Sequence, residues 1–266
     1  MRNGFQLDSF RFIPYLLVGL FLQIHFVAFS QNFEFERIPN ELGLSQNLIS
    51  ALWQDRQGFI WVGTKDGLNR FDGYHFEVFQ HDPFDSTSIS DNNIKSILED
   101  SQGRFWIATE NGLNLMNREK KVFERLYSKG KIEEGAPAIL HDHPGLSSGD
   151  IQSLMEDRDG NIWVGTLPGE VVKIELPPGA ETFDRARFTV FWPTAESNSL
   201  WGNGIKIMVQ DVEGTIWVHS KDQLCLIQPM EDGDYLIKRL HWEDFDPQWP
   251  NYRQEDFLNG HPDYVG

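Results

Sequence analysis

A fourfold repeat organises most of this 266-residue chain and constrains its fold more than any other feature. Four tryptophans stand 45, 57 and 54 residues apart, and each follows an aspartate by six residues, a glycine by three and an isoleucine by twelve. Such regular self-similarity, at intervals of roughly 20–50 residues, is typical of solenoids and propellers. The repeated positions are Asp55, Gly58 and Trp61; Asp100, Gly103 and Trp106; Asp157, Gly160 and Trp163; and Asp211, Gly214 and Trp217.

Each copy predicts four antiparallel strands. The first begins at the isoleucine, and the Asp-x-x-Gly that follows is a turn, in which the aspartate caps backbone amides and the glycine adopts a positive φ. The tryptophan strand, such as Phe59–Thr64, is apolar on both faces, which indicates burial on both sides. A short third strand at Leu68–Phe71 and an alternating fourth at Tyr74–Phe79 complete the unit. This is the pattern of a propeller blade.

The predicted fold is an all-β propeller with four four-stranded blades in an incomplete, open arc, since the four repeats supply no closing blade. The propeller region is 31–241, with blades at about 44–80, 89–127, 146–192 and 200–240, a strand of an absent closing blade at 33–38, and a tail at 242–266. Polar stretches at 129–149 and 177–187 are predicted loops. The fourth copy diverges: His219 replaces a small residue and Gln223 replaces a turn glycine.

The N-terminus has the order of a secretory signal peptide. Arg2 and Arg11 precede an apolar run from Phe12 to Leu22, and a small-x-small site ends at Ser30. We expect a signal peptide at 1–30, with cleavage between Ser30 and Gln31. An uncleaved membrane anchor is the alternative, but it needs about 20 apolar residues. The predicted mature chain has no membrane span and is periplasmic or extracellular.

Charge and cysteine content exclude some functions. The net charge of −17 disfavours nucleic acid as a partner, because phosphate binding needs a basic surface. The single cysteine, Cys225, allows no disulfide within the chain, and its apolar neighbours indicate a small core residue.

Two short motifs resemble metal sites only superficially. Asp157–Asn161 resembles the start of a calcium loop, but Pro168 stands where a bidentate glutamate is required. His141-Asp142-His143 has no distant partner ligand, and a solvated loop is the preferred interpretation. We predict neither a metal, a cofactor nor a catalytic residue, and the ligand-binding residues remain unknown at this level.

The strings Gly43–Asn47 and Asp55–Gly73, with their copies, resemble two-component regulator propeller repeats. That resemblance covers residues 33–240 and implies the periplasmic sensor region of hybrid histidine kinases, in which a propeller recognises an extracellular ligand, often an oligosaccharide, for a phosphorelay. The chain has no phospho-acceptor helix or nucleotide lid, so kinase activity is not carried over and no enzymatic activity is expected.

Two other functions stay open. Arg37-Ile38-Pro39 is similar to the opening motif of sialidases, which are glycoside-acting propeller enzymes; in their Asp-boxes, however, the aspartate precedes the glycine by two residues, against three here. A structural surface protein fits the same repeats. If the arc is open, its end blades expose apolar faces, and self-association through these open edges is expected.

Overall fold

The computed structural model describes residues 43–129, 136–195, 199–200, 204–221 and 223–240, and every element of this part of the chain is a strand. The signal peptide, its cleavage site, the 33–38 segment and the 242–266 tail lie outside the described residues. In the portion that the structure describes, no helix has the length and apolar character needed to cross a membrane.

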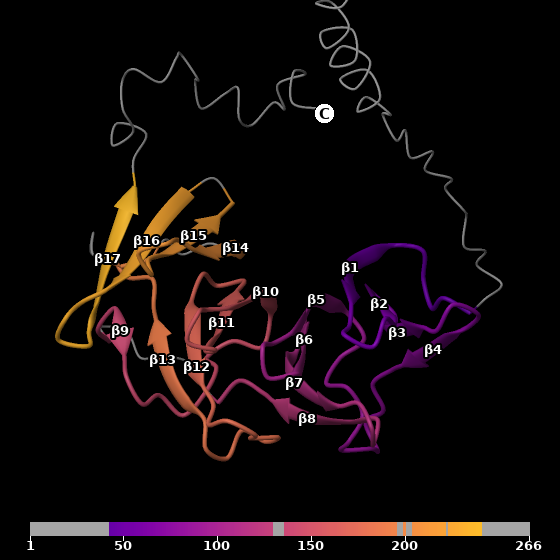
Figure 1. Ribbon diagram of the computed structural model, residues 1–266. Coiled ribbons are helices and arrows are strands. Elements are labelled where there is room, and N and C mark those ends of the chain that lie inside the picture. Colours follow the sequence, from indigo (N-terminus) through magenta and orange to yellow (C-terminus); the bar gives the residue numbers. More distant parts are fainter. Residues whose placement is uncertain (1–42, 130–135, 196–198, 201–203, 222, 241–266) are drawn as a thin grey trace, which may run out of the picture. The chain divides into compact units, whose positions relative to one another are not determined.

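The strands form four antiparallel sheets that follow one another along the chain (Figure 1). Blade 1 contains β1 (Ile49–Gln54), β2 (Ile60–Thr64), β3 (Gly67–Phe71) and β4 (Phe76–Phe79). Blade 2 contains β5 (Ile94–Glu99), β6 (Phe105–Thr109), β7 (Gly112–Asn117) and β8 (Val122–Leu126). Blade 3 contains β10 (Ile151–Glu156), β11 (Ile162–Thr166), β12 (Val171–Glu175) and β13 (Arg187–Phe191), and blade 4 contains β14 (Ile205–Gln210), β15 (Ile216–Ser220), β16 (Gln223–Pro229) and β17 (Tyr235–Leu240).

Blade 3 differs from the predicted four-stranded unit. Its sheet has five strands, because β9 (Ile139–Leu140) pairs with the outer edge of β13. This pair lies within the 129–149 stretch that the sequence predicts as a loop, so that prediction was wrong for Ile139 and Leu140. Strand β9 satisfies backbone groups of β13 that an edge strand would otherwise leave unpaired.

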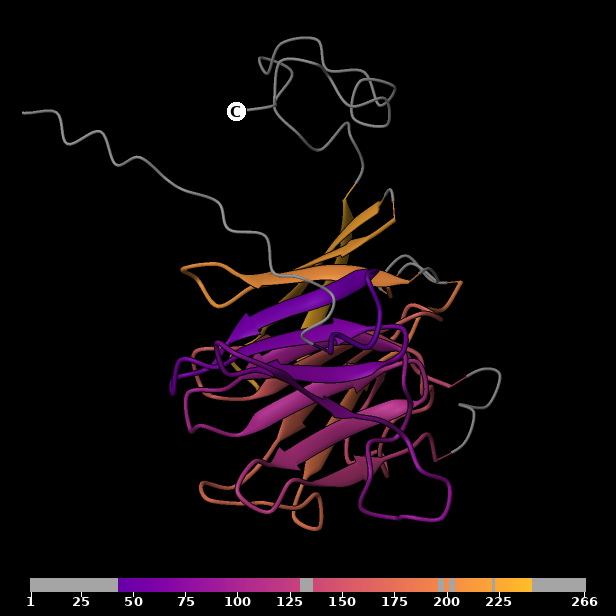
Figure 2. The same ribbon diagram turned by 90° about the vertical axis from the view of Figure 1, so that its right-hand side faces the viewer.

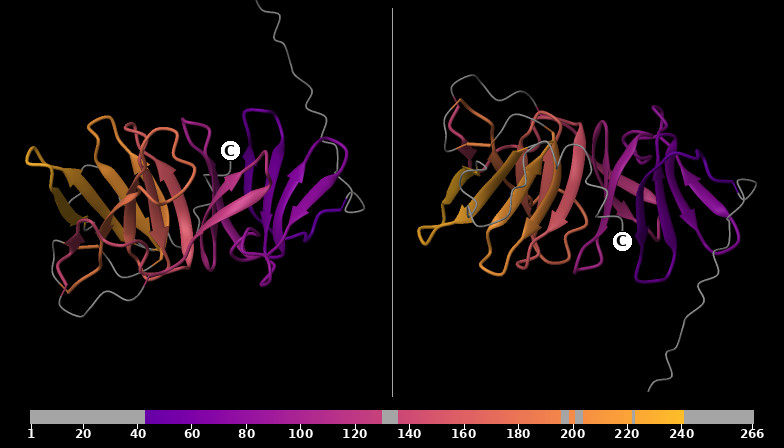
Figure 3. Two further views of the ribbon diagram at one scale, coloured as in Figure 1. Left: turned by 90° about the horizontal axis from the view of Figure 1, so that it is seen from below. Right: turned by 90° about the horizontal axis from the view of Figure 1, so that it is seen from above.

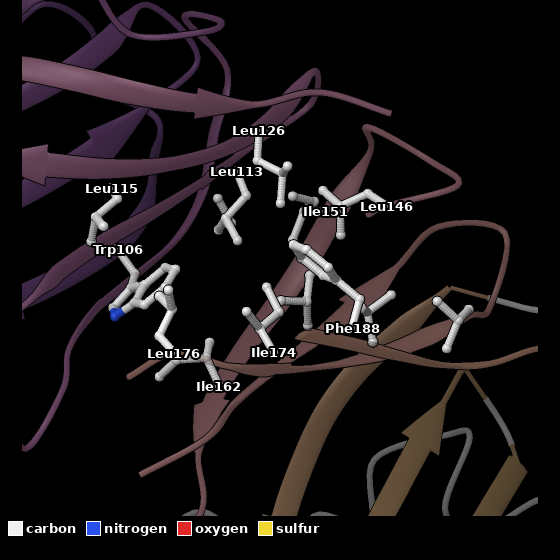
Figure 4. Packing of buried hydrophobic residues seen from close by; sticks show 14 residues of the cluster. Trp106, Leu113, Leu115, Leu126, Leu146, Ile151, Ile162, Ile174, Leu176 and Phe188 are labelled. Atoms are coloured by element: carbon white, nitrogen blue, oxygen red, sulfur yellow. The ribbon is translucent and has the colours of Figure 1, made fainter. Parts of the chain in front are cut away.

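Neighbouring blades pack face to face through the tryptophan strands. Trp61, Trp106 and Trp163 are 1%, 0% and 2% exposed, and each belongs to a core cluster completed by the following blade. Figure 4 shows this at the second interface, where Trp106 of β6 lies beside Ile162 of β11 and Leu176 beyond β12. The core is therefore a series of three sandwiched layers, one between each pair of blades.

The row of blades is open, as predicted (Figures 1 and 3). Blade 1 shows this most clearly at the isoleucine twelve residues before the tryptophan. Ile49 is 52% exposed, whereas its three counterparts are at most 1% exposed because each packs on the preceding blade: Ile94, Ile151 and Ile205. Leu52 on the same face is 65% exposed. Figure 2 is turned so that this side faces the viewer.

Blade 4 is the other end of the row. Trp217 is only half-buried, and its strand partner Val209 is 55% exposed, because no described blade covers that face. The prediction of apolar faces on both end blades is confirmed for the described residues.

Candidate binding face

The repeated aspartate and tryptophan form a structural unit at one end of the blades, here called the turn end. In each blade the aspartate accepts a hydrogen bond from the indole N–H, with O···N distances of 2.7–2.9 Å. Its other carboxylate oxygen accepts two backbone N–H groups of the turn, such as Gln57 and Phe59 on Asp55. The glycine three residues after the aspartate has a φ of 80–92° in all four turns, as expected. The sequence prediction missed the indole contact, which fixes the turn to the core.

Adjacent blades are also joined at the turn end by a repeated polar contact. The backbone N–H of Arg56 donates to Glu99 at 2.9 Å, and the N–H of Ser101 donates to Glu156 at 2.8 Å. At the third interface the N–H of Arg158 donates to Gln210 at 2.9 Å. These side chains are engaged in holding the blades together, so the turn end is a structural layer.

The opposite end, here called the loop end, contains the turns between the second and third strands and the segments that lead into each first strand. There an asparagine anchors the incoming segment: Asn69 accepts the N–H of Ser45 and donates to its hydroxyl, both at 2.9 Å. Asn114 makes the same two bonds to Ser90. Because both asparagines are buried, the loops above them are held in place.

Blade 3 uses a carboxyl group for this role. The side chain of Glu170 is fully buried. Its carboxylate accepts one hydrogen bond from the backbone N–H of Ser148 at 3.1 Å and another from the hydroxyl of Ser147. Burial raises the pKa of Glu170 from 4.5 to about 7, and the hydrogen bonds from Ser148 and Ser147 oppose that rise. Glu170 is enclosed beneath the loops, which fits an anchoring role better than catalysis.

We expect Glu170→Gln to remove a pH dependence of stability. Because the folded pKa lies above the unfolded value, the native state binds more protons between pH 4.5 and 7, and stability falls as the pH rises through this window. A shift of this size corresponds to about 3 kcal/mol. Thermal melts from pH 4.5 to 8 should show the wild type losing stability and Glu170→Gln losing much less. Glu124→Gln, at an exposed position of β8, is the control, and parallel curves for wild type and Glu170→Gln would contradict the assignment.

Partly exposed polar side chains line the loop end across blades 2 to 4. Lys95 lies 3.5 Å from Glu110, which also accepts the side-chain amide of Asn93. The Gln152 amide donates to Asp150 at 2.5 Å and accepts from Lys206 at 3.2 Å. This polar row consists of Asn93, Lys95, Glu110, Asp150, Gln152 and Lys206. The polar row has cationic donors, carboxylate acceptors and amides, and buried hydrogen bonds anchor the segments of the loop end. This arrangement is suited to binding a polar ligand.

The motifs that resembled metal sites have structural partners. Asp157 and Gly160 close the turn of blade 3 through a 3.1 Å backbone bond, as the turn interpretation predicts. His143 bonds the carbonyl of Gly145 through Nδ1, and His141 lies 3.4 Å from Asp234 of blade 4. Within the described ranges, no three His, Cys, Asp or Glu side chains are grouped as a metal site. Cys225 is buried in the core between blades 3 and 4.

Comparison with known proteins shows which repeat family and which relatives these blades resemble. A family model described as two component regulator propeller matches residues 43–66, 88–111 and 145–167, the turn and strand segments of the first three copies. A curated relative, histidine kinase P4 of Formosa agariphila, is 46% identical over 69 residues, which are 26% of this chain and 5% of that protein. The chain therefore spans only a small part of that relative.

Solved structures share the fold. Two crystal structures of the extracellular domain of BT4673 from B. thetaiotaomicron match with TM-scores of 0.53 and 0.55 and identities of 19% and 21%. One is named as a hybrid and the other as a one component system; the matches cover 80% and 82% of this chain and 32% and 29% of theirs. The described part of the chain is thus an all-β propeller segment, and its first three copies match the two component regulator propeller repeat.

Proposed function

We propose that this chain is the extracytoplasmic ligand-sensing portion of a two-component regulatory system, and that its ligand is an oligosaccharide or another extracellular signal. The repeat family supports the regulatory role, and the extracellular domains that share the fold support a location outside the cytoplasm, in the periplasm or beyond the cell. Export by the predicted signal peptide is part of the same proposal.

The polar row at the loop end carries the proposal for ligand binding. Sugar hydroxyls both donate and accept hydrogen bonds, and they need a surface that does the same. Glu110 in the turn between β6 and β7, Gln152 in β10 and Lys206 in β14 supply carboxylate, amide and ammonium groups. In blade 2 the buried bond between Asn114 and Ser90 holds the segment that leads into β5. A binding surface that is already ordered loses less conformational entropy when its ligand binds.

An array of defined oligosaccharides tests this proposal on the predicted mature chain, Gln31–Gly266. We expect binding of one structural class of sugar, and about tenfold weaker binding by Glu110→Ala or Lys206→Ala, the equivalent of one charged hydrogen bond. Gln57→Ala, an exposed position at the turn end, is the control that should bind like the wild type. Equal binding by all four proteins would show that the polar row is not the site, and no binding by the wild type would exclude a sugar ligand.

A further inference from the structure

One buried cation at the turn end of blade 2 is only partly paired. The Arg104 side chain is 8% exposed, and its Nε donates to Asp100 at 2.5 Å. Its terminal nitrogens, Nη1 and Nη2, are inaccessible to solvent, and within the described part of the chain neither has a hydrogen-bond partner. Each of these nitrogens carries two N–H groups. Burial therefore leaves the outer end of a charged side chain without water and without a replacement for it.

The carboxylate of Asp100 has no capacity left for these donors. One of its oxygens accepts the backbone N–H groups of Gln102 and Arg104, at 3.0 and 2.8 Å. The other accepts the indole N–H of Trp106 in addition to Nε of Arg104. A guanidinium binds a carboxylate or a sulfate best through two parallel N–H···O bonds. Nη1 and Nη2 of Arg104 provide the donors for such a pair.

A long loop of blade 3 lies over this part of blade 2. Residues 176–186, here called the covering loop, join β12 to β13, whereas residues 118–121 suffice for the same connection in blade 2. The Phe183 ring of the loop meets Trp106 edge-on, with 5.9 Å between centroids, and the Arg104 guanidinium lies 5.6 Å from the centre of the same indole ring. Leu176, at the start of the loop, lies beside Trp106 (Figure 4). The covering loop thus encloses the indole and the guanidinium together.

The covering loop is held to blade 2 by weak polar contacts. The backbone N–H of Gly179 donates to the side chain of Gln102 at 3.4 Å, and the amide of Asn117 donates to Glu181 at 3.4 Å. Both distances exceed those of an ordinary N–H···O bond. The loop also carries the exposed carboxylates of Glu181 and Asp184. Lifting the loop would therefore break few strong contacts, and it would make the surroundings of Arg104 more positive.

We propose that Arg104 is the anion-binding group of a second site, at the turn end between blades 2 and 3, and that the covering loop is its lid. When the loop lifts, Nη1 and Nη2 bind an oxyanion, either a sulfate or a carboxylate, beside the ring of Trp106. The ligand supplies the hydrogen bonds that the closed loop does not. This site lies at the opposite end of the blades from the polar row, and the inference is independent of the proposed sensing function.

Isothermal titration calorimetry of Gln31–Gly266 at constant ionic strength tests the site with two probes, inorganic sulfate and glucuronate. The wild type should bind one anion per chain, and Arg104→Gln should bind it at least about tenfold more weakly, as expected for the loss of a charged hydrogen bond. Phe183→Ala removes the lid's contact with Trp106 and should bind roughly 2- to 10-fold more tightly, because the open loop is then more populated. Arg185→Gln removes an exposed charge of the same loop and should bind like the wild type.

The two probes distinguish the sources of the anion. Sulfate binding identifies a free oxyanion as sufficient, and binding of glucuronate alone identifies an oxyanion carried on a sugar; either result supports the site when Arg104→Gln weakens it. Anion binding that Arg104→Gln leaves intact, with unchanged circular dichroism, would overturn the proposal. Failure of both the wild type and Phe183→Ala to bind either probe would do the same. An affinity of Phe183→Ala no higher than that of the wild type would overturn the lid, and this variant leaves Arg104 and its partner Asp100 in place.

Discussion

Replacing Trp106 with alanine should lower the free energy of unfolding by about 3–5 kcal/mol, the usual cost of truncating a buried large aromatic side chain. Trp106 is 0% exposed and lies in the core between blades 2 and 3 (Figure 4). Its loss would leave a cavity bordered by strands of both sheets, which cannot collapse without moving a blade. Urea unfolding followed by circular dichroism measures the change.

Asp100→Ala should be nearly as damaging, although a turn aspartate alone suggests a cost of only about 1 kcal/mol. Asp100 is completely buried and accepts hydrogen bonds from the indole N–H of Trp106 at 2.9 Å and from Nε of Arg104 at 2.5 Å. The Arg104 side chain is only 8% exposed, so removal of the carboxylate leaves a buried charge unpaired, at a cost of about 3–5 kcal/mol.

Asp159→Ala is the matched control, because Asp159 is exposed in the equivalent kind of turn and its change should stay within about 0.5 kcal/mol. A cost for Asp100→Ala as small as that of the control would show that the carboxylate does not hold the turn to the core.

The sequence predicted the elements that depend on local chemistry. Strand β2, the Asp-x-x-Gly turns and the positive φ of Gly58 follow from residue types at fixed spacing, and the structure confirms them. The exposed ends of the row also followed from counting repeats, because a blade needs a neighbour on each face. Ile49 and Trp217 show this at the two ends.

Contacts between distant segments were not predicted. The hydrogen bonds between Ser45 and Asn69 join residues that are 24 positions apart in the chain. Ser90 and Asn114 have the same separation in the second copy, and aligning the copies at these positions could have revealed the pair. In blade 3 the register offers no asparagine, so the role of Glu170 becomes visible only when the chain is folded. The short strand β9 was missed because two residues carry no periodicity, and its pairing depends on the free edge of β13.

The second large effect concerns the open ends of the row. We propose that Gln31–Gly266 self-associates, because burial of exposed apolar side chains such as Leu52 and Ile49 is favourable by roughly 1.5–3 kcal/mol each. We expect the free face of blade 1, on which Ile49 and Leu52 are exposed, to pair with the same face of a second copy. Such a pairing is isologous and closes at two chains.

Light scattering on purified Gln31–Gly266 tests most directly whether the four repeats form an open row of blades. The apolar side chains on the exposed end faces of such a row should drive association. We expect twice the mass of one chain at high protein concentration. Leu52→Asp should reduce this mass to that of a single chain, while Val212→Asp, in an exposed turn of blade 4, should leave it unchanged. A compact, stable monomer of the wild type at every concentration would contradict the proposed self-association.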